Sequence, residues 1–127
     1  MTPADYIAKA ERALSAARIL LQAEDSEGAC NRGYYAMHDA AHAALIAAGH
    51  ETHDSPIKTH HGLIAEFGKK LVQSGQMEVS LGRALNKAED IRLLADYSPE
   101  SPPLVEARLM VEQAEAFVAA IKNKFSL

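Results

Sequence analysis

Hydrophobic residues recur every three to four positions along five stretches of the chain, and this is the period of an α-helix. The five stretches cover residues 3–23, 25–48, 56–74, 77–95 and 102–125. None of them alternates hydrophobic and polar residues with the period of two that is typical of a strand. We therefore expect an all-α fold, a five-helix up-and-down antiparallel bundle in which residues 1–127 form a single domain.

Capping signals set the predicted helix ends. Thr2 and Asp5 have the spacing of a capping box, in which each side chain accepts the backbone N–H of the other residue. Gly49 suits the left-handed conformation that commonly ends a helix, and a polar connection over residues 50–54 follows it. Ser101 precedes two prolines, so we expect Ser101 to cap the last helix.

The second stretch carries two unusual faces. With about 100° of rotation per residue, Asn31, Tyr35, His38 and His42 fall into one polar stripe. A helix that only fills a core would place Leu and Ile there, so this stripe is the main clue to function. The neighbouring face has almost no side chains and either packs on another helix or forms a dimer seam. Its residues are Gly33, Ala36, Ala40, Ala43, Ala44 and Ala47.

The composition limits the classes of protein to which the chain can belong. The chain of 127 residues is 48% apolar and 24% charged, which is typical of soluble globular proteins. No apolar run approaches the roughly 20 residues that span a bilayer, and the first residues lack the basic start of a signal peptide. A single cysteine, Cys30, fits a reducing compartment. We therefore expect a cytoplasmic protein without a membrane contact.

The net charge of −4 argues against sequence-independent coating of nucleic acid, because such proteins carry a basic excess. A contact with RNA or a nucleotide would need a local basic patch, or a dimer that joins two patches. Lys58, Lys69 and Lys70 make the third helix the most basic element, although a solvated face explains these lysines nearly as well.

Histidines at helical spacing raise the question of a metal site. His38 and His42 are one turn apart, as in many pairs of metal ligands. Further histidines are His50, His53, His60 and His61. A zinc site normally needs three or four convergent ligands, and the sequence contains neither HExxH nor paired CxxC motifs. We expect no metal and no other cofactor, with hydrogen-bonded or solvated histidines instead.

Arg32 and His38 form an Arg-x5-His pair. Arginine supplies a fixed charge that matches phosphate, and histidine exchanges a proton near neutral pH. These properties serve metal-free RNA cleavage, in which a base activates the ribose 2′-hydroxyl and a cation stabilises the phosphorane. The two residues lie roughly 120° apart around the helix. They would converge on one phosphate only through the long arginine side chain or a second subunit.

Arg92 continues an apolar stripe of the fourth helix, so it is expected to be partly buried, and a buried guanidinium must be paired. Asp96 lies four residues on, within reach of Arg92, and Tyr97 follows at the helix end. The pair is either a structural ion pair at the end of the helix or an arginine that Asp96 orients into a cleft.

Three segments carry a resemblance to a known family: Asn31–Ala41, Thr59–Phe67 and Ala88–Tyr97. Their order resembles the HEPN family (higher eukaryotes and prokaryotes nucleotide-binding domain), in its small stand-alone prokaryotic form. The Tyr-Tyr-Ala segment and the Arg…Ala-Asp-Tyr ending are moderately specific together and weak separately. The resemblance spans nearly the whole chain.

The resemblance implies a five-helix bundle that is usually dimeric. Relatives are often encoded beside a small nucleotidyltransferase, and several act as metal-independent RNases in toxin–antitoxin or defence systems. The signature of those RNases is Arg-x(4–6)-His near the start of a late helix, at the dimer cleft. Here Arg92 is followed by Asp96 and Tyr97 with no histidine in range, whereas Arg32 and His38 satisfy the spacing on the second helix.

The leading hypothesis is a HEPN-like homodimer that binds RNA or a nucleotide and acts as a metal-independent endoribonuclease. The candidate proton-transfer residues are His38 and His60, and the candidate ligand-binding residues are Asn31, Arg32, Tyr35, Arg92, Asp96 and Tyr97. The arginines would hold phosphate and the tyrosines would stack on the ligand. One alternative is a non-catalytic helical module that partners a small nucleotidyltransferase. Another is a structural dimer whose polar groups only fix helix register.

Overall fold

The computed structural model describes residues 1–52 and 55–127, and all regular elements in these ranges are helical. The elements are α1 (Pro3–Gln22), α2 (Ser26–Ala47), α3 (His60–Glu66), the π-helical segment η1 (Phe67–Val72), α4 (Val79–Tyr97) and α5 (Leu104–Phe125). The predicted all-α fold with five α-helices is confirmed. Two residues of the predicted polar connection, His53 and Asp54, lie outside the described residues.

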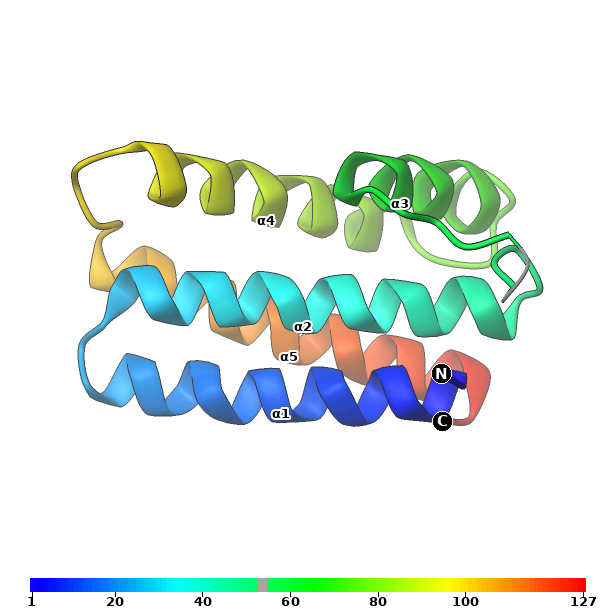
Figure 1. Cartoon of the computed structure of the whole chain (residues 1–127), viewed down its shortest axis with the longest axis horizontal. Helices are drawn as coiled ribbons and strands as arrows, with labels where there is room; N and C mark the ends of the chain where they lie inside the picture. The colour runs from blue at the N-terminus through cyan, green and yellow to red at the C-terminus, as the bar shows by residue number, and fades with distance from the viewer. Residues whose placement is uncertain (53–54) are drawn as a thin grey trace.

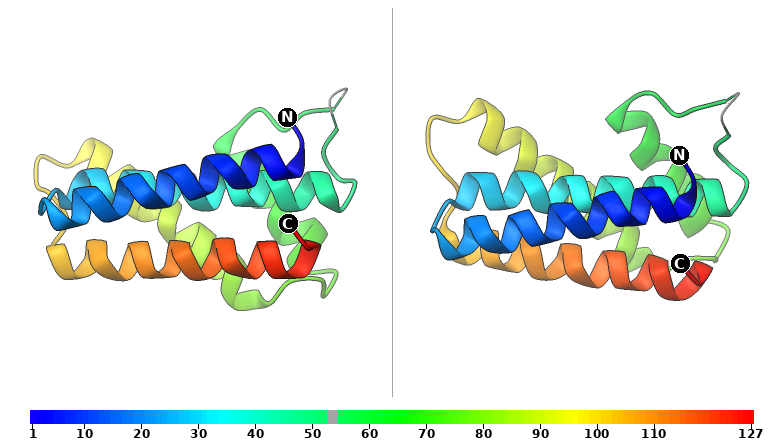
Figure 2. Two further views of the ribbon diagram at one scale, coloured as in Figure 1. Left: turned by 90° about the horizontal axis from the view of Figure 1, so that it is seen from below. Right: turned by 60° about the horizontal axis from the view of Figure 1, so that its bottom comes forward.

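Helix α2 lies at the centre of the bundle. Helices α1 and α5 pack on one side of it, and α3, η1 and α4 lie on the other side (Figure 1). Within the described ranges, α1 contacts α2 and α5 but neither α3 nor α4. Helices α1, α2 and α5 run alongside one another in both further views (Figure 2). The side of α2 that faces away from α1 and α5 is therefore covered only by α3, η1 and α4.

Two predicted helix ends are confirmed by their geometry. The Thr2 hydroxyl oxygen accepts the Asp5 N–H at 3.1 Å, and the Asp5 carboxylate accepts the Thr2 N–H at 2.7 Å, which completes the capping box. Gly49 adopts a φ of +82°, the left-handed conformation that most side chains disfavour.

Two other helix starts differ from the prediction. Helix α3 begins at His60, later than expected, because extended Thr59 caps it by accepting the Gly62 N–H at 2.9 Å. The prediction that Ser101 caps the last helix is wrong, since Pro103 is the N-cap and no side-chain hydrogen bond forms there. A residue that precedes a proline disfavours the helical conformation, so Pro102 cannot begin the helix that Ser101 would cap.

The small face of α2 packs inside the chain. A Cβ on Gly33 would lie 3.6 Å from the Met110 side chain and 3.8 Å from Ala114 Cβ, both on α5. The buried alanines of this face are Ala36, Ala40, Ala43 and Ala44. The buried part of this face therefore serves close helix packing within one protomer, whereas Ala47 at its end is exposed.

The chain has no helix in the described ranges that combines the length and the apolar character needed to cross a bilayer.

Candidate functional site

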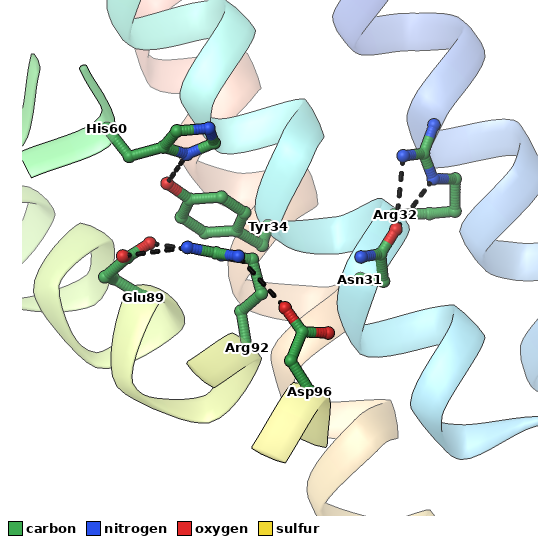
Figure 3. Close-up of polar contacts among 7 residues, drawn as sticks. All are labelled: Asn31, Arg32, Tyr34, His60, Glu89, Arg92 and Asp96. Atoms are coloured by element: carbon green, nitrogen blue, oxygen red, sulfur yellow. Dashed lines mark hydrogen bonds and ion pairs between the residues drawn. The ribbon is translucent and has the colours of Figure 1, made fainter. Parts of the chain in front are cut away.

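Tyr34 joins three helices at the centre of the candidate site (Figure 3). Its side chain is completely buried on α2, and its hydroxyl lies 2.7 Å from Nδ1 of His60, the first residue of α3. The Arg92 guanidinium of α4 lies 4.9 Å from the centre of the Tyr34 ring, within the range of a cation–π interaction. One buried phenol thus fixes an imidazole and a guanidinium from two other elements.

Arg92 is held by two carboxylates of its own helix. Its guanidinium donates to Glu89 at 3.0 and 3.3 Å and to Asp96 at 3.0 Å. Only 14% of the Arg92 side chain is exposed, and the hydrogen bonds to Glu89 raise the pKa of Arg92. The predicted pairing of Arg92 with Asp96 is therefore present. Because two carboxylates share one guanidinium, this part of the site carries no excess positive charge.

The protonation states of Tyr34 and Glu89 follow from their surroundings. Burial first, and then the nearby Glu89 carboxylate, raise the pKa of Tyr34, so its phenol keeps its proton. Burial alone would raise the pKa of Glu89, but hydrogen bonds from Arg92 and Tyr34 outweigh burial and lower it. The site therefore contains an ionised carboxylate beside a neutral phenol, whose hydroxyl can both donate and accept a hydrogen bond.

His38 lies behind His60, with the two ring centres 4.4 Å apart. Burial, with smaller contributions from His42 and His60, lowers the pKa of His38 to about 3. Its Nε2 atom is buried and has no hydrogen-bond partner among the described residues. His38 is therefore a neutral imidazole near pH 7.

His42 and Glu51 form a buried pair next to His38. Nδ1 of His42 lies 2.7 and 2.9 Å from the two carboxylate oxygens of Glu51, which is only 5% exposed. The same carboxylate accepts the backbone N–H of Ile57 at 3.0 Å. Tyr6 of α1 stacks on the His42 ring at 4.9 Å. Glu51 thus links Ile57, which precedes α3, to His42 of α2 through hydrogen bonds.

The three clustered imidazoles do not converge as metal ligands. Nδ1 of His42 is occupied by Glu51, and Nδ1 of His60 is occupied by Tyr34. Over residues 1–52 and 55–127, no group of three His, Cys, Asp or Glu side chains is placed to hold a metal ion. His53 belongs to the residues that the structure does not describe.

Arg32 lies apart from this cluster. Its guanidinium donates to the Asn31 side chain at 3.1 and 3.2 Å, lies 4.9 Å from the centre of the Tyr35 ring, and points toward α1 in Figure 3. Asn31 and Arg32 line a hollow of about 360 Å³ together with Asp25, Glu27 and Asp96, so carboxylates outnumber the arginine there. Tyr35 contacts both Arg32 and His38, since its ring centre also lies 6.2 Å from that of His38.

Tyr97 also lies outside the cluster. It is 84% exposed at the end of α4, beside Leu94, which is 68% exposed. With Asp90, Leu93 and Ser98, these residues line a mostly apolar surface hollow of about 520 Å³. The structure thus joins His38, His60 and Arg92 around Tyr34, and Arg92 links Asp96 to them. Tyr35 lies between this cluster and Arg32, and Tyr97 lies apart.

The sequence did not predict three residues of this site: Tyr34, Glu89 and Glu51. Glu89 had a signal, because it precedes Arg92 by three residues and so shares its helix face. Tyr34 had none that separates it from its neighbour Tyr35. Glu51 lies in a connection without helical periodicity, so its burial and its contact with His42 depend on how the chain returns to α2.

A family model and several known proteins match this chain over most of its length. A model of the HEPN domain matches residues 4–124. A protein of Methanocaldococcus jannaschii named "Putative toxin" is 37% identical over 90% of this chain and 81% of its own length. A UPF0332 protein of Gloeobacter violaceus is 33% identical over 93% of both chains. A UPF0332 protein of Thermotoga maritima is 30% identical over 91% of this chain and 84% of its own length.

Proposed function

Since the chain belongs to the HEPN family, we propose that it is an RNA-binding toxin component that cleaves RNA without a metal ion, with His60 as the proton-transfer residue. The toxin name of a relative supports the biological role. The observation that carries the chemistry is the 2.7 Å contact between Nδ1 of His60 and the buried Tyr34 hydroxyl.

This contact orients His60 as a base. Glu89 is an ionised carboxylate and can only accept hydrogen bonds, so it attracts the single hydroxyl proton of Tyr34. The Tyr34 oxygen is then free to accept the Nδ1–H of His60, and in this tautomer the lone pair that takes a proton lies on Nε2. His60 and His38 are both half-buried, but the Nε2 atom of His38 is buried without a partner and the pKa of His38 is lowered. In our proposal His60 therefore reacts, and His38 is packed behind it.

The proposed reaction is transesterification. Nε2 of His60 takes the proton of a ribose 2′-hydroxyl, the 2′-oxygen forms a bond to phosphorus, and the bond from phosphorus to the 5′-oxygen breaks. The 5′-oxygen leaves with a proton from water, and a 2′,3′-cyclic phosphate remains. Arg92 acts here as a positioning residue, because Glu89 and Asp96 neutralise it while it packs on Tyr34.

The remaining assignments are part of the same proposal. We propose a cytoplasmic homodimer, and we retain Tyr35 beside His60 as a stacking residue, since their ring centres are 5.7 Å apart. Ligand contacts by Asn31, Arg32 and Tyr97 stay predictions.

Replacing His60 by glutamine is expected to lower RNA cleavage by about 10²- to 10⁴-fold, the usual contribution of a positioned acid–base group. The matched control is His61→Gln, because His61 is the exposed neighbour on the same helical turn. Cleavage of single-stranded RNA is measured with excess EDTA. Equal activity of H60Q and wild type, or activity that EDTA abolishes, would contradict the proposal.

A second candidate function is supported by the exposed apolar end of α4, where Leu93, Leu94 and Tyr97 reach solvent. This surface favours a non-catalytic module that docks on another protein, such as a small nucleotidyltransferase. Purified wild-type protein that binds such a partner and leaves RNA intact would favour this function over cleavage.

A further inference from the structure

The charge of the chain is divided unevenly between its parts. Residues 55–88 contain five lysines and arginines but only two glutamates, a net charge of +3. The rest of the chain contains eight basic and fifteen acidic residues, a net charge of −7. The overall acidity of the protein therefore conceals one basic segment, and this asymmetry indicates a binding surface for an anion. The five basic residues, called here the basic segment residues, are Lys58, Lys69, Lys70, Arg83 and Lys87.

The fold keeps this segment together. It comprises α3, η1 and the first half of α4, which lie on the same side of α2 (Figure 1). Gly82 of α4 approaches η1 so closely that a Cβ there would lie 3.1 Å from the Val72 side chain. Arg83 therefore lies on an element that is packed directly against the one that carries Lys69 and Lys70.

The basic segment residues are available to a ligand. Four of them are exposed and Lys70 is half-buried. None of the five takes part in an ion pair with another residue of the described ranges. Unpaired cations on one side of an acidic molecule create a local positive potential that attracts a polyanion.

Their position relative to His60 suggests which polyanion binds. His60 and His61 begin α3, between Lys58 and η1. Arg92, the cation that packs on Tyr34, is neutralised by Glu89 and Asp96. A phosphodiester that reaches His60 therefore needs positive charge from another source, and the basic segment supplies it beside His60.

We infer that the surface formed by α3, η1 and the first half of α4 binds the phosphate backbone of single-stranded RNA and leads it to His60. This inference rests on the proposed function for the position of the scissile phosphate. The binding itself is independent of cleavage. The contact is electrostatic and not selective for base sequence, so its affinity should fall steeply with salt.

The test measures binding and cleavage separately. The probe is short single-stranded RNA of random sequence with 2′-O-methyl groups, which removes the attacking hydroxyl and prevents cleavage. Its Kd is measured between about 50 and 200 mM salt. The variants are Lys69→Gln with Lys70→Gln, and the control removes the same charge from α5 through Arg108→Gln with Lys124→Gln, both exposed residues.

We expect K69Q/K70Q to weaken binding at least tenfold at the lower salt concentration. The slope of log K against log salt should become shallower by about 1.4, the value for two lost contacts with a single strand. R108Q/K124Q should bind like the wild type. The inference would be overturned if both double variants weakened binding equally or if the wild type did not bind the RNA. It would also be overturned if polyglutamate bound as tightly as the RNA, because the surface would then be assigned to an acidic protein. If the wild type binds this RNA through Lys69 and Lys70 but does not cleave unmodified RNA, the proposed function fails and the binding surface stands.

Discussion

Acidification from about pH 6.5 to about pH 4.5 is expected to destabilise the folded protein by about 2–3 kcal/mol through His38 alone. Its pKa is lowered to about 3 by burial in the folded chain and returns to 6.5 on unfolding. Between these two values the unfolded chain binds a proton that the folded chain does not. The contribution of His38 to the free energy of unfolding is therefore complete above about pH 6.5 and is lost progressively as the pH falls toward 3.

The measurement is urea unfolding of wild type and His38→Leu at both pH values. Leucine removes the titrating group and the unpartnered Nε2 atom while it fills most of the ring volume. We expect H38L to lose less stability than the wild type on acidification. His61→Gln, which changes an exposed histidine, should follow the wild type. Parallel losses in the wild type and H38L would show that His38 is not the buried neutral group described above.

Replacing Glu51 by alanine is expected to lower the free energy of unfolding by about 3 kcal/mol, because breaking a buried pair leaves its partners without an acceptor. The groups affected are Nδ1 of His42 and the backbone N–H of Ile57. Glu51→Gln keeps an acceptor oxygen and should cost about 1 kcal/mol. Urea unfolding near neutral pH measures both values. A loss of less than about 0.5 kcal/mol in the free energy of unfolding of E51A would show that Glu51 contributes no more to stability than an ordinary surface residue.

Local chemistry was enough to predict much of the fold. Helical periodicity, the Thr2 capping box and the left-handed Gly49 depend on neighbours within a few residues, and all three are confirmed. The errors arose where competing local signals met. Ser101 is a good capping residue, but the two prolines after it delay the helix to Leu104.

The candidate site was predictable only where its residues share a helix. The pairing of Arg92 with Asp96 follows from their four-residue spacing on α4. The contact of Tyr34 with His60 joins residues 26 apart and depends on the course of the connection between α2 and α3. No periodicity encodes that course, so the central contact of the site emerged only from the structure.

In the proposed function, the site and the basic surface have separate tasks. The cluster around Tyr34 orients His60 but holds no excess positive charge, since Glu89 and Asp96 both pair with Arg92. The exposed cations of residues 55–88 supply the charge that the cluster lacks. This division explains how a chain with a net charge of −4 could still bind a polyanion.

The most direct test of this account is an NMR titration of the histidine ring nitrogens with 2′-O-methyl single-stranded RNA near pH 7, with signals assigned through H60Q and H38L. The account predicts that Nε2 of His60 is unprotonated in the free protein and that its signal shifts as RNA is added, while the signal of the buried Nε2 of His38 stays unchanged. An Nε2-protonated His60 in the free protein, or a His60 signal that RNA leaves in place while the rest of the protein binds it, would contradict the account.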